Sequence, residues 1–227
     1  MAIKPILFNT EMVRAILDGR KDATRRIVKG FIPDDAVWGY TAFTPKGYIS
    51  CRGTFADGYG EKFFKLPCEP GDILYVRETF AWCPCWDCGL DIEPGRCSNA
   101  TAKIYKEGEY GCYMYRASCE DNEYPSADTW HPSIHMPKEA ARIGLKVTDV
   151  RVERLQEITE DGAKAEGANF KNGKNVGFEE KMNRTAIERF TEIWNSTIKK
   201  SDLDRYGWDA NPWVWVIEFE RCEKPQK

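Results

Sequence analysis

Four cationic side chains, one hydroxyl and one carboxylate are concentrated in segment 19–26, which reads Gly-Arg-Lys-Asp-Ala-Thr-Arg-Arg. This segment follows a predicted amphipathic helix over residues 11–18. Such a density of positive charge creates a local field that attracts a phosphate or another anion. The alternative is a solvated surface, in which Arg20 and Lys21 cap the last helix carbonyls and Asp22 pairs with one of them.

The charge of the whole chain restricts where a nucleic acid can bind. The 227 residues carry a net charge of -3, and 30% of them are charged and 42% hydrophobic, as in an ordinary soluble globular protein. A globally basic nucleic-acid-binding protein is therefore excluded, and any such site must be a local patch. Residues 20–29 qualify as a patch, since they hold five Lys or Arg and one Asp.

A cysteine-rich segment differs in composition from the rest of the chain. Six of the nine cysteines lie between about residues 82 and 130, where acidic residues outnumber basic ones, and this indicates an insertion into the parent fold. A tetrahedral thiolate zinc site fits the spacing of four of them, which are Cys83, Cys85, Cys88 and Cys97. Such a zinc would be structural, because this acidic segment is poor in the aliphatic residues that build a core. The alternative is a set of reduced thiols without metal.

The other elements follow from hydrophobic periodicity and capping residues. Strands are predicted at residues 3–8, 70–78, 145–152 and 212–219, with short strands and turns over residues 31–70. Helices are predicted at residues 11–18, after Asn9 or Thr10 as the cap, and at residues 159–167, between Thr159 and Gly167. A longer helix carries an apolar stripe made of Phe178, Met182, Ile187, Phe190 and Trp194.

These elements predict an α+β chain with a small β-barrel-like sheet, a few surrounding helices and the cysteine-rich insertion, as one domain over residues 1–227. The apolar register of strand 145–152 shifts near Thr148, which predicts an irregularity there. His135 is flanked by apolar residues and is expected to be buried rather than catalytic. For Glu78, at the end of a strand, a structural ion pair is the favoured interpretation.

Four motifs together resemble the ASCH domain, a branch of the PUA-like superfamily. They are Gly-x-Lys after the first helix, Gly-Asp-x-Leu-x-Val-Arg-Glu at 71–78, Ile-Thr-Glu-Asp-x-Ala-x-Ala-Glu-Gly at 158–167 and Val-Trp-Val-Ile-Glu-Phe at 214–219. Longer stretches at 12–21, 132–137, 147–156 and 208–219 are similar to the phage and prophage subgroup of that family. The resemblance covers both ends and the middle strands, and it fails across residues 82–130 and parts of 31–65.

The resemblance implies a PUA-like fold with a basic cleft that suits RNA or a modified nucleoside. Some small ASCH proteins are similar to amidohydrolases that remove the acyl group of N4-acetylcytidine, and their catalytic places match Lys21, Thr24 and Glu166. The roles would be base, nucleophile and acid, and this chemistry requires no cofactor. Other members imply two alternatives, a non-catalytic RNA-binding regulatory module and a ribonuclease.

The chemistry of these residue types is consistent with hydrolysis. The flanking arginines would lower the pKa of Lys21, so that its amine can deprotonate the hydroxyl of Thr24. Glu166 stands in the last turn of its helix, where the helix dipole favours the protonated acid, whereas a salt bridge to Lys21 or Arg26 would restore its charge. In an extended strand, a spacing of three puts Lys21 and Thr24 on opposite faces. Their convergence therefore predicts irregular backbone just before Thr24.

The remaining candidate ligand contacts are Arg20, Arg25, Arg26, Arg77, Trp82 and Trp130. The two tryptophans flank the insertion and either stack on a base or fill a core. No apolar run approaches the roughly 20 residues that a membrane span needs, and the first residues lack a signal-peptide pattern. A cytoplasmic protein without a membrane partner is the resulting expectation, and the sequence carries no information on protein partners.

Overall fold

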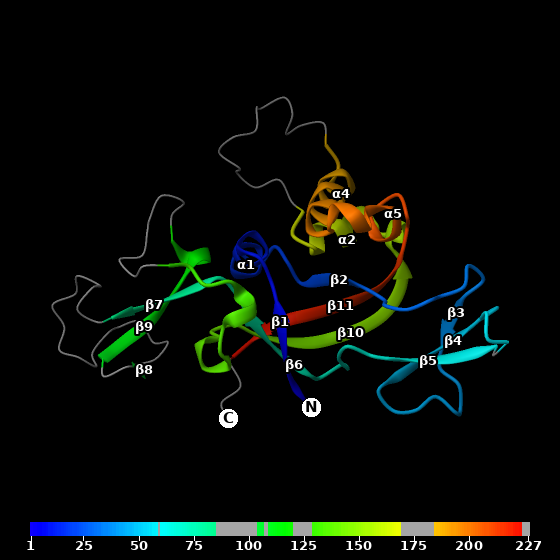
Figure 1. The fold of residues 1–227 in the computed structure, drawn as a ribbon, viewed down its shortest axis with the longest axis horizontal. Helices are drawn as coiled ribbons and strands as arrows, with labels where there is room; N and C mark the ends of the chain where they lie inside the picture. The colour runs from blue at the N-terminus through cyan, green and yellow to red at the C-terminus, as the bar shows by residue number, and fades with distance from the viewer. Residues whose placement is uncertain (59, 85–103, 107–108, 120–128, 169–183, 224–227) are drawn as a thin grey trace. The chain divides into compact units, whose positions relative to one another are not determined.

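The computed structural model describes residues 1–58, 60–84, 104–106, 109–119, 129–168 and 184–223. The chain divides into two compact units. Each contains helices and strands, which are labelled in Figure 1. The first unit comprises Met1, Arg20–Asp72 and Val147–Glu220, and the second comprises Ala2–Gly19, Ile73–Lys146 and Arg221–Lys227.

Three strands form the sheet of the first unit, in the order β10 (Gly144–Arg154), β11 (Trp213–Cys222) and β2 (Ala23–Ile27). Strand β2 is antiparallel to β11, with Thr24 opposite Ile217 and Arg26 opposite Trp215. Because successive side chains of a strand point to opposite faces, Thr24 and Arg26 share one face of β2, and Ala23, Arg25 and Ile27 share the other.

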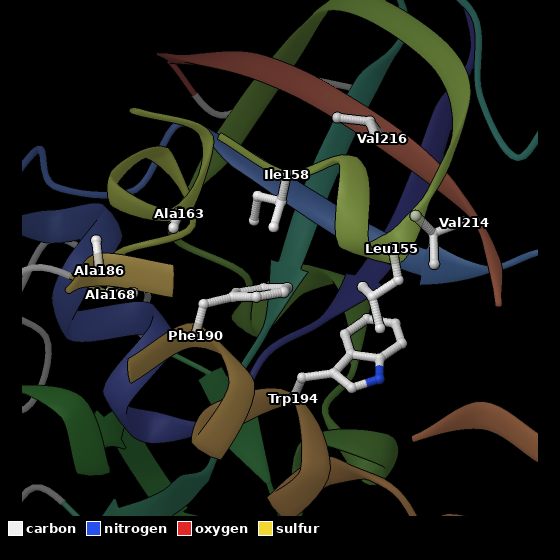
Figure 2. Packing of buried hydrophobic residues seen from close by; sticks show 9 residues of the cluster. All are labelled: Leu155, Ile158, Ala163, Ala168, Ala186, Phe190, Trp194, Val214 and Val216. Carbon is white, nitrogen blue, oxygen red and sulfur yellow. The ribbon is translucent and has the colours of Figure 1, made fainter. Parts of the chain in front are cut away.

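Helices α2 (Glu160–Ala165) and α4 (Ala186–Thr197) cover one face of this sheet, and the short α5 (Leu203–Tyr206) follows them. Figure 2 shows the apolar cluster between them, which consists of Leu155, Ile158, Ala163, Ala168, Ala186, Phe190, Trp194, Val214 and Val216. Helix α4 forms here because its apolar residues recur every four positions, and because Thr185 and Glu188 make a reciprocal N-terminal cap.

A second sheet of the first unit consists of β3 (Val37–Gly39), β4 (Tyr48–Arg52) and β5 (Glu61–Lys65), joined as an antiparallel meander. One of its faces is internal: Ile49 and Cys51 are buried, and Trp38 packs edge-on against Phe64 with ring centroids 5.1 Å apart. The internal face therefore supplies a core for this sheet, and the other face carries the exposed side chains of Val37, Arg52, Phe63 and Lys65 beside the buried Ser50.

The second unit contains β1 (Ile3–Leu7) parallel to β6 (Ile73–Arg77), with the first three residues of β10 antiparallel to β6. Helix α1 (Thr10–Leu17) begins at the Asn9 cap and ends at Gly19, whose φ of +69° favours glycine. Strands β7 (Phe80–Pro84), β9 (Glu109–Tyr115) and β8 (Ile104–Lys106) form an antiparallel sheet.

Short 3-10 helices complete both units. They are η1 (Arg116–Ser118), η2 (Ser133–His135), η3 (Lys138–Ala140), η4 (Leu155–Glu157) and η5 (Lys200–Asp202).

The predicted elements are largely confirmed, including their caps. The α+β class is also confirmed, but no closed barrel forms among the described residues. Strand β10 is continuous, and its buried positions change from odd numbers, Leu145 and Val147, to the even number Val150, which is the predicted shift near Thr148. Two residues of the predicted stripe, Phe178 and Met182, lie outside the described residues.

The expectation for His135 was wrong. Its side chain is exposed at the end of η2, and Met136 is the buried residue of that turn. Apolar neighbours in the sequence do not bury a residue in a 3-10 turn, because successive side chains there point in different directions. Glu78 is a buried partner of Arg142, at 2.9 and 3.0 Å, as the structural interpretation predicts. No helix in the described part of the chain has the length and hydropathy to cross a membrane.

Candidate functional site

The backbone brings Lys21 and Glu166 side by side although 145 residues separate them. The two residues form an isolated antiparallel bridge. Next to it, the amide of Asp22 donates to the Ala165 carbonyl at 3.0 Å, and the Asp22 carbonyl accepts from the Phe219 amide at 2.8 Å. The segment before β2 is thus held both by the end of α2 and by β11, and this fixes where the Lys21 side chain begins.

Helix α2 positions Glu166 at its C-terminal cap. The helix starts at Thr159, whose hydroxyl accepts from the Gly162 amide at 3.0 Å, and it stops at Gly167, whose φ is +86°. Since only glycine adopts this backbone conformation easily, the sequence Ala-Glu-Gly places Glu166 in the last turn. Its carboxylate is directed inward, where the side chain is 6% exposed.

The Lys21 ammonium is completely buried and donates three hydrogen bonds. Its acceptors are the Glu166 carboxylate at 2.6 Å, the Glu166 carbonyl at 3.0 Å and the Ala23 carbonyl at 2.8 Å. Three acceptors match the three N–H groups of an ammonium. Burial lowers the pKa of Lys21 below its ordinary value, the Glu166 carboxylate opposes this, and the charges of Arg26 and Arg25 add to the lowering.

A chain of alternating charges extends from this pair to the surface. Nη1 of Arg25 lies 3.4 Å from the Glu166 carboxylate, and Nη2 lies 3.3 Å from the carboxylate of Glu153. Glu153 also accepts from Nε of Arg151 at 2.5 Å. Nη1 of Arg151 then donates to Asp149 at 2.8 Å and Glu218 at 2.6 Å. We refer to Lys21, Glu166, Arg25, Glu153 and Arg151 as the charge chain.

Arg25 is a structural member of this chain. Its side chain is 3% exposed, and its guanidinium lies 5.8 Å from the ring centroid of Phe190 in the apolar cluster. Its Nε is buried and has no hydrogen-bond partner among the described residues. Since two carboxylates and a ring surround its guanidinium, Arg25 stabilises the fold and orients Glu166.

Thr24 is buried in β2. The strand begins only at Ala23, and Asp22 separates it from the bridge at Lys21. The Lys21 ammonium bonds the carbonyl of the peptide that joins Ala23 to Thr24, so the amine lies near the threonine backbone. Arg26, on the same face of β2 as Thr24, is half-buried, and burial lowers the pKa of its guanidinium while the charge of Glu166 opposes this.

The other predicted ligand contacts have diverse surroundings. In the first unit, Arg20 donates to the Gly167 carbonyl at 3.5 Å. In the second unit, Arg77 donates to the carbonyls of Met136, at 2.8 Å, and Ile134. Trp82 packs against the cluster around Phe80 and Met136, which favours the core interpretation. Trp130 lies 5.7 Å from the guanidinium of Arg116.

The predicted zinc site lies outside the described residues, since Cys85, Cys88 and Cys97 are not described and neither is the side chain of Cys83. Of the cysteines in this segment that are described, Cys112 is buried and Cys119 is partly exposed. Within the described part of the chain, no group of three His, Cys, Asp or Glu side chains could hold a metal.

Sequence reasoning missed Glu153 and Arg151 as parts of the site. Their signal was the alternation Asp149, Arg151, Glu153, which places three charges on one face of a strand. Nothing in the sequence pairs that face with Arg25. Comparison with known proteins adds no relative: no protein-family model matches the chain, and neither a curated protein nor a solved structure matches it.

Proposed function

We propose that this chain is an ASCH-type, PUA-like protein that binds a modified nucleoside beside the Lys21–Glu166 pair and hydrolyses its N4-acyl amide, as in N4-acetylcytidine. One observation carries the proposal. A buried lysine lies 2.6 Å from a buried glutamate and also donates to the carbonyl of the peptide that precedes buried Thr24, which supports a base and an acid beside the candidate nucleophile. The proposed substrate comes from the family resemblance of the sequence.

The 2.6 Å hydrogen bond between Lys21 and Glu166 allows one proton transfer to bring both groups into the protonation states that hydrolysis needs. If the proton of Lys21 moves to the Glu166 carboxylate, the pair becomes a neutral amine and a neutral carboxylic acid. Burial favours this form because it removes two charges from a medium of low dielectric. Arg25 works against it by attracting the carboxylate, but at 3.4 Å its contact is longer than that of Lys21.

In the acyl transfer that follows, every proton that Glu166 donates is matched by one that Lys21 accepts. The Lys21 amine accepts the hydroxyl proton of Thr24, whose oxygen attacks the acyl carbon, and Glu166 gives its proton to the departing N4 nitrogen. Cytidine leaves, the acyl group is an ester on Thr24, and the ion pair is restored. A second transfer within the pair lets Lys21 take a proton from water, whose oxygen attacks the ester. Glu166 protonates the Thr24 oxygen, and the carboxylic acid leaves.

The second candidate is a non-catalytic nucleic-acid-binding module. It is favoured by the three hydrogen bonds of Lys21, because an ammonium with all its hydrogens donated stabilises a fold without any reaction. In that case the charge chain is structural, and a nucleic acid contacts the protein elsewhere.

The experiment incubates the purified protein with N4-acetylcytidine and follows cytidine release by chromatography. Thr24→Val removes the hydroxyl with little change in shape, and we expect it to stay folded and lose turnover. Arg142→Ala breaks a buried ion pair in the second unit, so it controls for destabilisation and should retain turnover. Absence of turnover by the native protein, or equal turnover by Thr24→Val, would refute the hydrolase.

A further inference from the structure

The outward face of the β3–β4–β5 sheet combines exposed aromatic and cationic side chains. The cross-strand register places its residues in rows: Val37, Arg52 and Glu61 form the first, Gly39, Ser50 and Phe63 the second, and Tyr48 and Lys65 the third. We call these eight residues the outer face. Phe63 is 39% and Val37 55% exposed, and Arg52 and Lys65 are exposed as well.

The outer face carries more positive than negative charge, since Arg52 and Lys65 stand against one acid, Glu61. Glu61 accepts a hydrogen bond from Ser50, which leaves its charge in place. No ion pair of Arg52 or Lys65 occurs within the part of the chain that the structure describes. Two cations are therefore available to an anionic partner, and the nearby Asp57 is engaged with Lys62, whose position in β5 is on the internal face.

The loop between β3 and β4 adds two more exposed rings. Tyr40 is 66% and Phe43 84% exposed. The loop is folded by a turn in which the Thr44 amide donates to the Thr41 carbonyl at 3.1 Å, and the Thr41 amide donates to the Thr44 hydroxyl at 2.8 Å. Phe43 therefore extends from a defined turn.

Ser50, which lies between Gly39 and Phe63 in the second row, is only 1% exposed, so a ligand would contact the edges of the outer face rather than its centre. At one edge, a Cβ atom built on Gly39 would meet nothing within 4 Å. Of the large hydrophobic side chains that are exposed in the described residues, five lie in residues 31–63: Phe31, Val37, Tyr40, Phe43 and Phe63. Val37 and Phe63 share one face of the sheet, and exposed apolar side chains that gather in this way favour an interaction surface.

We propose that the outer face and the adjoining Tyr40 and Phe43 form a platform for single-stranded nucleic acid, on which bases stack against the rings and phosphates pair with Arg52 and Lys65. Stacking tolerates any base, since every base has a π face. A duplex would not fit this chemistry, because its bases are already stacked on one another. The platform is separate from the Lys21–Glu166 pair and requires no acyl group on the ligand.

The test measures fluorescence anisotropy of a labelled oligouridine of about ten nucleotides, long enough to cover a small sheet. Phe63→Ala should weaken binding by about 5- to 100-fold, the range of one lost stacking contact. Arg52→Ala should reduce the slope of log K against log salt by about 0.7, the value for one phosphate contact on a single strand.

Two variants elsewhere control for loss of surface area and of charge. Ile134→Ala removes an apolar side chain that is 61% exposed in the second unit, and Lys199→Ala removes an exposed cation, so both should bind like the native chain. Thr24→Val should also bind the oligouridine, which separates this result from the hydrolase experiment.

The proposal is overturned if the native chain does not bind the oligouridine, or if Phe63→Ala and Arg52→Ala bind it as the controls do. It is also overturned if sedimentation shows a dimer of the native chain that Phe63→Ala abolishes while oligouridine binding is unchanged. The outer face would then be an interface between copies.

Discussion

Removing one partner of the Lys21–Glu166 pair should destabilise the first unit strongly. In Lys21→Met, the Glu166 carboxylate keeps only the longer contact to Arg25 at 3.4 Å and loses the 2.6 Å contact to the ammonium. In Glu166→Leu, the buried ammonium keeps two carbonyl acceptors but no counter-ion in the pair. Breaking a buried ion pair in this way costs about 3–5 kcal/mol, because a desolvated charge is left uncompensated.

The double variant, Lys21→Met with Glu166→Leu, should lose less than the sum of the two single variants. It removes both charges together, and replacement of a buried pair by apolar residues is often close to neutral. Groups in direct contact typically couple by about 0.5–3 kcal/mol, and we expect a coupling at or above the upper end of this range, the larger the closer the double variant comes to native stability. Arg25 still pairs with Glu153 in the double variant, at 3.3 Å.

Urea unfolding followed by circular dichroism measures these free energies. Arg189→Ala is the matched control: it breaks an exposed pair with Glu192 at 3.0 Å, where about 0.5 kcal/mol or less is at stake. If Lys21→Met cost no more than this control, or if the single effects simply added, the buried pair would not contribute as an ion pair. The role given to the charge chain would then be wrong.

Three further predictions concern other groups. Phe190→Ala should cost about 3–5 kcal/mol in the same unfolding assay, because Phe190 is buried against Trp194 and Trp208, whereas exposed Arg189→Ala on the same helix should not. Burial and the Asp35 carboxylate raise the pKa of Cys51 to about 11. Iodoacetamide at pH 8 should therefore leave this thiol unmodified in the folded protein and modify it in urea, as mass spectrometry of its peptide would show. Rapid labelling of the native protein would contradict the burial of Cys51. The folded-state pKa of Lys21 is lowered, so the unfolded chain binds more protons than the folded chain between that pKa and the ordinary lysine value. The contribution of Lys21 to the free energy of unfolding should therefore rise with pH across this window. Urea unfolding at several pH values should show this rise for the native chain and not for Lys21→Met.

Local signals in the sequence predicted most of the secondary structure. Helix α2 begins at Thr159 and stops at Gly167 because a hydroxyl cap and a glycine with positive φ act within one turn. The apolar stripe of Phe190 and Trp194 predicted the buried face of α4, because the spacing of such a stripe depends only on the geometry of the helix itself.

The site was partly predictable. Spacing predicted irregular backbone before Thr24, and this stays a prediction: the backbone groups of Asp22 bond to Ala165 and Phe219 on either side. The helix dipole and a salt bridge made opposite predictions for the charge of Glu166, and only the structure shows that Lys21 and Arg25 both pair with it.

The sequence by itself determined where helices and strands start and stop, because caps, glycines and hydrophobic periods operate over a few residues. Tertiary structure decided which charges meet. The contacts from Lys21 to Glu166 and from Arg25 to Glu153 span 145 and 128 residues, and no local preference encodes a distance of that length. It also decided that His135 is exposed and that the sheets stay open among the described residues, since burial and strand closure depend on what packs against an element.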